Sequence, residues 1–288
     1  MHASCEASIQ YDVLFASRPA PALRHLIRHY YQVQDSLAGR VSVQPVPARS
    51  PQILEFMFGT RYQVYRTDRK TTEDVRAMAL VGSRTCRSAE LILSGAVDAF
   101  TVVFQPGAFS SLFHLPAAEL TNADFDGEDV LGRRISELYA RLGEVSAFHD
   151  RIRIADDYLT ALRPPNESVS AVVRTAMTVI RAHGSVRISE LAHQTALGIR
   201  QFERRFHQEI GVSPKLYARI IRFEAALQRR AVSPTTRWTE IAHALGYHDQ
   251  MHMVHDFTRL SGDSPEAIAR QLDMFVQPEV LLAKPPPS

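Results

Sequence analysis

The feature that most constrains the fold of this chain is an internal repeat in its C-terminal third. The segment Ser189–His193 (SELAH) returns 50 positions later as Thr239–His243 (TEIAH). The segment Gly211–Pro214 (GVSP) returns 51 positions later as Gly262–Pro265 (GDSP). Because the repeat keeps its order, spacing and chemistry over this length, it indicates two copies of one structural unit.

Each copy predicts two helices joined by a tight turn. In the first copy, Phe202, Phe206 and Ile210 fall on one face of the second helix, and Gly211 suits the left-handed position at a helix end. The opposite face is expected to be exposed, and it carries Arg200, Gln201, Glu203, Arg204 and His207. The same polar face is therefore the first candidate for a binding surface.

The second copy has a less basic helix over residues 250–260, with Asp249 as its expected N-cap. Met253 and Phe257 take the buried positions of Phe202 and Phe206. The exposed positions are predicted to be those of Gln250, Met251, His252 and His255.

A longer helix is predicted between the two copies. Leu216, Ile220, Phe223 and Leu227 recur at helical spacing. At about 1.5 Å per residue, a helix from Lys215 to Arg230 is roughly 24 Å long. The C-terminal domain is thus expected to be all-α, with two helix-turn-helix units joined by a linker helix.

The charge of the chain is concentrated in this domain, although the whole chain has a formal net charge of only +2. Residues 170–270 contain 14 Lys and Arg against 9 Asp and Glu, whereas residues 1–169 contain 18 against 20. A basic half with tandem helical hairpins favours a nucleic-acid partner.

The first half predicts a mainly-β, sandwich-like or barrel-like domain with added helices, which makes the whole chain α+β. Short apolar and aromatic segments bounded by turn residues predict the strands, at residues 8–15, 52–58, 62–66, 78–81, 91–93 and 99–104. Helical spacing predicts helices at residues 22–33, 108–115, 132–142 and 147–162.

The boundary between the domains is predicted at Arg163-Pro164-Pro165-Asn166, because tandem prolines cannot continue a helix. We expect a sensing or dimerisation domain at residues 1–163 and a linker at 164–168. A DNA-binding domain at 169–270 and a C-terminal tail at 271–288 follow.

The motifs of the C-terminal domain resemble those of the AraC/XylS family of bacterial transcription regulators. The resemblance rests on ISELA, RQFERRFHQEIGVSP, RFEAAL, EIAHALGYHDQ and FTRLSGDSP, in this order over about residues 168–270. The segment VVFQPGAFSSLFHLPAAELTNADF at 102–125 resembles, more weakly, the β-rich N-terminal domain of one branch of that family.

The resemblance implies base contacts by Arg200, Glu203 and Arg204, with Gln201 and His207 nearer the phosphates. A bidentate contact from Arg to guanine gives about 1–3 kcal/mol of discrimination. The second helix departs from the family pattern, with Met253 in place of a common aromatic residue and Val254-His255 in place of a small polar residue and Arg. We therefore expect the first recognition helix to carry most of the sequence reading.

The resemblance also implies a function and a set of partners. The chain is expected to be a sequence-specific transcription regulator, not an enzyme, that inserts two recognition helices into adjacent major grooves. The implied partners are an operator in double-stranded DNA, RNA polymerase, a small-molecule effector at the N-terminal domain and a second copy of the chain.

Other classes of function remain as alternatives. Three alternatives concern the β-rich half, which would be a metalloenzyme, a DNA-repair protein fused to a DNA-binding domain, or a dimerisation module without an effector. The first two lack their motifs, since no His-x-His occurs in the first half and the chain has only Cys5 and Cys86. No cofactor is expected.

Spacing offers two candidate metal sites, and neither is predicted to bind a metal. His248, His252 and His255 are spaced for one helical face, but His248 precedes the expected N-cap, so no zinc site is predicted. The acidic segment at residues 124–129 does not have EF-hand spacing and is expected to be a solvated loop with a helix N-cap.

The two isolated cysteines favour a reducing compartment, and no apolar run approaches the length of a membrane helix. A cytoplasmic location is therefore expected.

Overall fold

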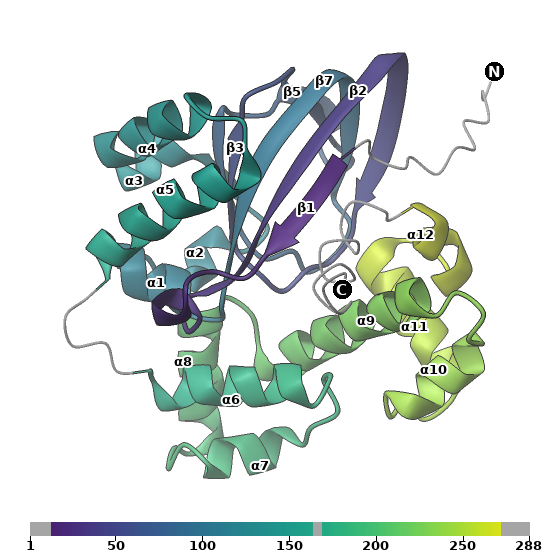
Figure 1. Ribbon diagram of the computed structural model, residues 1–288. Coiled ribbons are helices and arrows are strands. Elements are labelled where there is room, and N and C mark those ends of the chain that lie inside the picture. The colour runs from purple at the N-terminus through teal and green to yellow at the C-terminus, as the bar shows by residue number, and fades with distance from the viewer. Residues whose placement is uncertain (1–12, 164–168, 272–288) are drawn as a thin grey trace, which may run out of the picture.

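The computed structural model describes residues 13–163 and 169–271. A β-rich domain comes first in the chain, and a helical domain packs beneath it in the view of Figure 1. The fold class predicted from the sequence is confirmed. The predicted linker at 164–168 and nearly all of the predicted tail lie outside the described residues.

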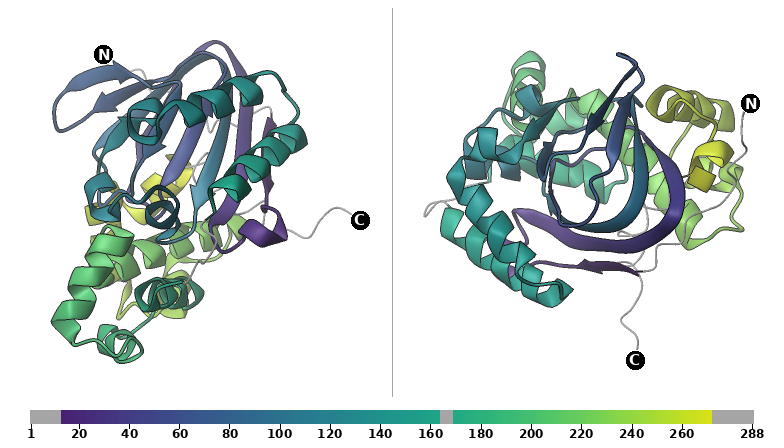
Figure 2. Two further views of the ribbon diagram at one scale, coloured as in Figure 1. Left: turned by 90° about the vertical axis from the view of Figure 1, so that its left-hand side faces the viewer. Right: turned by 90° about the horizontal axis from the view of Figure 1, so that it is seen from above.

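The β domain is built on one antiparallel sheet of eight strands. The strands are β1 (Val13–Ser17), β2 (Ile27–Val46), β3 (Ile53–Met57), β4 (Gln63–Arg66), β5 (Thr71–Asp74), β6 (Met78–Val81), β7 (Ala89–Phe104) and β8 (Asp124–Asp126). Their order is β1-β2-β7-β3-β6-β8, and β4 pairs with both β5 and β7. The sheet curls strongly on itself (Figure 2).

Strand β7 produces much of this curl because its two halves pair with different strands. Its residues from Ala89 to Ile92 pair with β4, and those from Ala99 to Val103 pair with β3. Gly95 lies between the halves with φ +71°, a conformation that favours glycine. The two strands predicted at 91–93 and 99–104 are therefore one bent strand.

The helix predicted at residues 22–33 is wrong. Only the 3₁₀ turn Pro21–Leu23 forms there, and β2 begins at Ile27. Tyr30 and Tyr31 pair with Val102 and Thr101 of β7, so sheet pairing overrides the helical spacing of the apolar residues.

Helices cover one face of the sheet and surround the main core of the β domain. They are α1 (Ala108–Phe113), α2 (Ala117–Leu120), α3 (Gly127–Leu131), α4 (Arg133–Gly143) and α5 (Phe148–Leu162). The core joins Tyr30, Phe56 and Phe100 of the sheet to Leu138 of α4 and Leu159 of α5. A second apolar cluster lies on the other face of the sheet, inside its curl.

The helical domain contains the predicted repeat. Its helices are α6 (Ala171–Arg181), α7 (Ile188–His193), α8 (Ile199–Ile210), α9 (Pro214–Val232), α10 (Trp238–Ala244), α11 (Gln250–Ser261) and α12 (Pro265–Gln271). Helix α9 contributes Tyr217, Ala218 and Ile221 to the core of the first unit. Its later residues, including Phe223 and Leu227, belong to the core of the second unit.

The segment from Ala48 to Gln52 of the β domain runs across both units. The backbone N–H of Ala48 donates to the Leu260 carbonyl at 2.8 Å. The Ser50 backbone N–H and hydroxyl donate to the two carboxylate oxygens of Glu224 on α9, at 2.6 and 2.8 Å. The Gln52 side-chain amide reaches the Ile210 carbonyl at 3.5 Å. One short segment thus contacts the linker helix and the C-terminal ends of both α8 and α11.

Within the described residues, no helix is both long enough and apolar enough to cross a membrane.

Candidate DNA-binding interface

The first helix-turn-helix unit consists of α7 and α8, supported by α6 and α9. Phe202, Phe206 and Ile210 of α8 are buried, and the Phe206 ring packs edge-on against the Tyr217 ring of α9 with centroids 5.5 Å apart. Helix α8 ends at Gly211, which has φ +101° and donates its N–H to the His207 carbonyl. This apolar face fixes which side of α8 remains exposed.

The exposed side of α8 carries all five predicted residues, which are Arg200, Gln201, Glu203, Arg204 and His207. Arg200 and Arg204 lie one helical turn apart, so they project from the same face. Among the described residues, none forms an ion pair with Arg200 or Arg204. Both guanidinium groups are therefore available to a ligand.

Ile199, the first residue of α8, is a further candidate that no sequence motif singled out. Its side chain is 46% exposed although it is a large apolar residue. An apolar side chain at the start of a recognition helix can contact the methyl group of thymine. Its spacing from Phe202 and Phe206 places Ile199 on the apolar side of α8, but it is the first residue of the helix and remains exposed there.

The second unit consists of α10 and α11, and its core uses Met253 and Phe257 of α11. The predicted N-cap is present, because the Asp249 carboxylate accepts the His252 backbone N–H at 2.7 Å. This hydrogen bond lowers the pKa of Asp249 below its usual value. Helix α11 ends at Gly262 with φ +78°, as α8 ends at Gly211.

The exposed side of α11 carries all four predicted residues, which are Gln250, Met251, His252 and His255. The repeat places Met251 at the position of Arg200 and His255 at the position of Arg204. Asp256 takes the position of the exposed Arg205, but it is buried and forms an ion pair with Arg219 of α9 at 2.6 Å. The exposed face of α11 is therefore less basic than that of α8.

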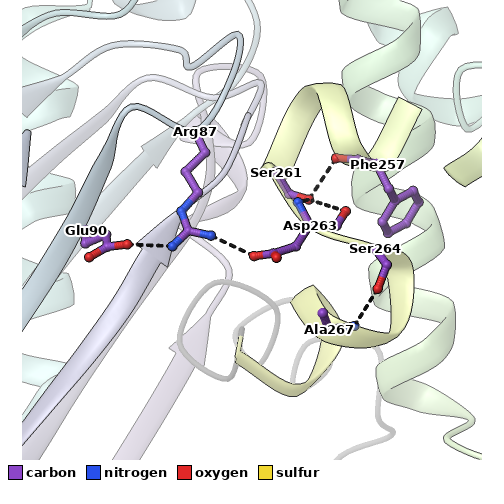
Figure 3. Close-up of polar contacts among 7 residues, drawn as sticks. All are labelled: Arg87, Glu90, Phe257, Ser261, Asp263, Ser264 and Ala267. Atoms are coloured by element: carbon purple, nitrogen blue, oxygen red, sulfur yellow. Dashed lines mark hydrogen bonds and ion pairs between the residues drawn. The ribbon is translucent and has the colours of Figure 1, made fainter. Parts of the chain in front are cut away.

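Both recognition helices touch the β domain at their C-terminal ends. The Thr121 hydroxyl after α2 donates to the Gly211 carbonyl at 2.7 Å, and Arg87 forms an ion pair with Asp263 at 2.7 Å (Figure 3). Each helix has 12 residues and is about 18 Å long. The β domain therefore contacts the C-terminal ends of α8 and α11, whereas Arg200 and Gln250 lie in their first turns.

The acidic segment at 124–129 is not the solvated loop expected from the sequence, because residues 124–126 form β8 and pair with β6, but the expected helix N-cap is present. The Asp126 carboxylate caps α3 by accepting the Glu128 N–H at 2.9 Å. Asp124 forms ion pairs with Arg66 and Arg84. No group of three or more potential metal ligands occurs in the described part of the chain.

A second candidate site lies inside the curl of the sheet. This cavity has a volume of about 100 Å³ and combines polar residues from distant segments, among them Tyr31, Arg49, Glu55, Tyr62, Arg66 and Arg84. Sequence reasoning missed it because these residues share no motif and meet only through strand pairing.

Comparison with known families identifies two regions of the chain. A helix-turn-helix domain family model matches residues 191–271, and a model of a domain of unknown function, DUF6597, matches residues 16–126. The C-terminal domain belongs to the AraC-type helix-turn-helix domains, which confirms the resemblance expected from the sequence. Fold and family together define the class of the protein as a DNA-binding transcription regulator.

Solved structures give weaker similarities. ToxT from Vibrio cholerae is 9% identical and matches 90% of this chain and 99% of its own chain, with a TM-score of 0.48. Its unsaturated fatty acid bound form is 10% identical, with coverages of 92% and 98% and a TM-score of 0.48. The AraC-like transcriptional activator CuxR is 10% identical, with coverages of 77% and 87% and a TM-score of 0.25.

A search of curated proteins finds no match.

Proposed function

We propose that the chain regulates transcription by inserting α8 and α11 into two adjacent major grooves of an operator. The observation that carries this proposal is the pair of repeat-related helices. Each has a buried apolar face and an exposed polar face, and the two pack against different halves of α9. A single chain thus presents two recognition helices on one support.

The length of α9 is compatible with this arrangement. Its 19 residues form a helix of about 28 Å. Two major grooves on one face of a duplex lie about 34 Å apart. The lateral offset of the recognition helices from α9 and a modest bend of the DNA supply the difference.

We propose unequal roles for the two helices. Arg200 and Arg204 each read guanine, Glu203 accepts from a cytosine amine, and Gln201 and His207 contact phosphates. The four predicted contact residues of α11 have no formal positive charge when the histidines are neutral, because they are Gln250, Met251, His252 and His255. This helix therefore contributes shape and contact area more than base discrimination.

The β domain is proposed to control DNA binding. A small molecule bound there changes the population of the DNA-competent arrangement only if it binds the two arrangements with different affinity. RNA polymerase and a second copy of the chain are the further partners proposed for such a regulator. Sedimentation of the purified chain with and without DNA tests the second copy directly.

In vitro selection from random duplex DNA, followed by footprinting, tests the bipartite mode. We expect protection in two major grooves about one helical turn apart. Inserting 5 base pairs between the half-sites turns them to opposite faces of the duplex and should reduce affinity to that of one half-site. The same insertion outside the footprint is the matched control. Protection of one groove only, with equal affinity for both altered duplexes, would contradict the proposal.

A further inference from the structure

The second helix-turn-helix unit carries a group of exposed histidines that the proposed function leaves without a role. They are His243, His248, His252 and His255, which fall in the segment of α10 and α11 that corresponds to the DNA-facing part of the first unit. Histidine is the side chain whose charge ordinarily changes between pH 5 and 8. The charge that this unit offers to DNA therefore depends on the proton concentration.

The internal repeat indicates where two of these histidines lie relative to DNA. The offset of 51 residues places His252 at the position of Gln201 and His255 at the position of Arg204. Both histidines are exposed in the structure, as their counterparts on α8 are. If α11 lies in its groove as α8 does, both imidazole rings come close to the DNA backbone, where phosphates are the nearest anions.

The surroundings of His255 contain no acid that is placed to hold a proton on its ring. Among the described residues, none forms an ion pair with His255. The neighbouring Asp256 is buried, and its carboxylate is paired with Arg219 of α9 at 2.6 Å. Arg259 follows His255 at i+4 on the exposed side of α11, and like charges at this spacing repel each other. An external anion is therefore needed to favour the charged form of His255.

The start of α11 differs, because Asp249 is present there. Its carboxylate accepts the His252 backbone N–H at 2.7 Å and lies 3.1 Å from Nδ1 of His248. The hydrogen bond from His252 and then the contact with His248 lower the pKa of Asp249, so this carboxylate is ionised throughout the neutral range. The His252 ring itself packs edge-on against the Tyr247 ring, with centroids 5.6 Å apart. Asp249 thus pairs directly with His248 and caps the helix below His252.

The elements that pack against α11 carry further charged groups, most of which have partners of their own. They are Arg219 of α9 with Asp256, Arg222 of α9 over the Tyr247 ring, Glu266 of α12 with Arg230, Arg87 of the β domain with Asp263, Glu240 of α10 beside Val232 of α9, and the exposed Arg270 of α12. On α11 itself, Arg259 is the fixed positive charge of the exposed side. Any further positive charge on that side comes from histidine.

The first unit has fixed charge where the second has histidine. Helix α8 exposes Arg200, Arg204 and Arg205, whose guanidinium groups stay protonated at every pH at which the chain is folded. His207 is the titratable cation of that helix. The contact of α8 with DNA should therefore change much less with pH than the contact of α11.

We infer that His252 and His255 take up protons when α11 enters its groove, so that a fall in pH strengthens the contact of the second unit with DNA far more than that of the first. The inference rests on the proposed function, because it concerns the same DNA interface. The DNA-bound chain then holds more protons than the free chain, and affinity must increase as pH falls. The gain is complete once the histidines of the free chain are protonated, and it is lost when pH is high enough to leave them neutral on DNA.

Proton uptake on binding is the most direct test. Calorimetric titration of the full chain with a selected duplex at pH 7.0, in buffers of different ionisation enthalpy, measures it. We expect a net uptake of up to about two protons, most of which the double variant His252→Gln/His255→Gln should lose. His149→Gln, at an exposed position of the β domain, is the matched control and should keep it. No net uptake, or equal uptake in the double variant and the unaltered chain, overturns the inference.

Affinity for the same duplex at pH 8.0 and pH 6.0, at constant ionic strength, tests the consequence. We expect roughly ten-fold tighter binding at pH 6.0, with a slope of log affinity against log salt more negative by up to about 1.8, because two more phosphates are neutralised. The double variant should lose most of both changes, and His252→Arg/His255→Arg should bind tightly at both pH values. His255→Gln alone keeps the test decisive if the double variant does not fold, since the His252 ring packs on Tyr247. Equal affinity of the unaltered chain at the two pH values overturns the inference.

A shortened duplex assigns the effect to the second unit. Footprints of Arg204→Ala identify the half-site of α8 by its loss of protection, and a duplex that ends after this half-site removes the contact of α11. We expect most of the pH dependence to disappear on it, and equal pH dependence on both duplexes overturns the assignment to α11. A bipartite footprint with an affinity that is independent of pH overturns this inference alone. Failure to select any DNA sequence at either pH overturns the proposed function as well.

Discussion

The Nη1 atom of Arg87 in the β domain lies 2.7 Å from Oδ2 of Asp263, two residues beyond the end of the second recognition helix (Figure 3). Arg87 also pairs with Glu90 at 2.6 Å, so its guanidinium group bridges the two domains. In the first unit, Thr121 contacts the carbonyl of Gly211, at the corresponding helix end. The β domain thus contacts equivalent ends of both recognition helices.

Replacing Arg87 should loosen the second unit without unfolding it. The side chains of Arg87 and Asp263 are 23% and 30% exposed, and partly exposed ion pairs contribute about 0–1 kcal/mol. We expect Arg87→Met to leave the melting temperature almost unchanged and to increase amide hydrogen exchange around residues 262–268. Arg69→Met, whose side chain is 75% exposed, is the matched control. Unchanged exchange in both variants would show that the ion pair does not restrain this unit.

The two glycines that end the recognition helices provide a comparison of matched substitutions. Both have positive φ, so alanine costs roughly 1–2 kcal/mol at either position. At Gly211 a Cβ atom would also lie 2.7 Å from Thr121 Oγ1 and 2.9 Å from the Ala117 carbonyl oxygen. At Gly262 the nearest atom, Arg87 Cδ, is 3.6 Å away, which is an ordinary contact.

We therefore expect Gly211→Ala to destabilise the chain by roughly 1 kcal/mol more than Gly262→Ala, because it adds overpacking at the domain interface. Thermal melts of the two variants measure the difference. Equal melting temperatures, or a lower one for Gly262→Ala, would indicate that the atoms around Gly211 shift to accommodate the added Cβ atom. The domain interface would then not constrain the first unit.

The helical domain could be predicted closely because its information is local. The spacing of Phe202, Phe206 and Ile210 defines the buried face of α8, and Asp249 marks the start of α11. These signals lie within a few residues of the structure that they specify. These local signals also placed the predicted DNA-contacting residues on the exposed faces of α8 and α11.

The β domain could be predicted only as a class. The apolar residues at 22–33 fit a helix, and only pairing with β7 makes them part of β2. Arg151 is fully buried because it reaches Asp98, 53 residues earlier, at 2.6 Å, and Ser50 meets Glu224 across 174 residues. No local pattern encodes such contacts, so the cavity and the domain interface required the folded structure.

Arg204→Ala should remove sequence preference while leaving weak DNA binding. Arg204 is exposed on α8 one turn after Arg200, and loss of one bidentate contact to guanine costs about 1–3 kcal/mol. In binding assays with labelled duplexes we expect roughly 5- to 150-fold weaker binding to the selected sequence and a small change on random DNA. The β-domain variant Arg69→Ala is the control. An unchanged footprint would remove Arg204 from the reading surface.

The second recognition helix should gain affinity from a positive charge that it lacks. His255 occupies the repeat position of Arg204, is exposed, and precedes the buried Asp256, which is already paired with Arg219. We expect His255→Arg to tighten DNA binding and to make the slope of log affinity against log salt more negative by about 0.9, because one more phosphate is neutralised. His149→Arg, on an exposed position of the β domain, should change neither quantity.

We also expect His255→Ala to weaken binding far less than Arg204→Ala. If the two alanine variants lose the same affinity and the same sequence preference, α11 reads DNA as strongly as α8, and the unequal roles proposed for the two helices are wrong.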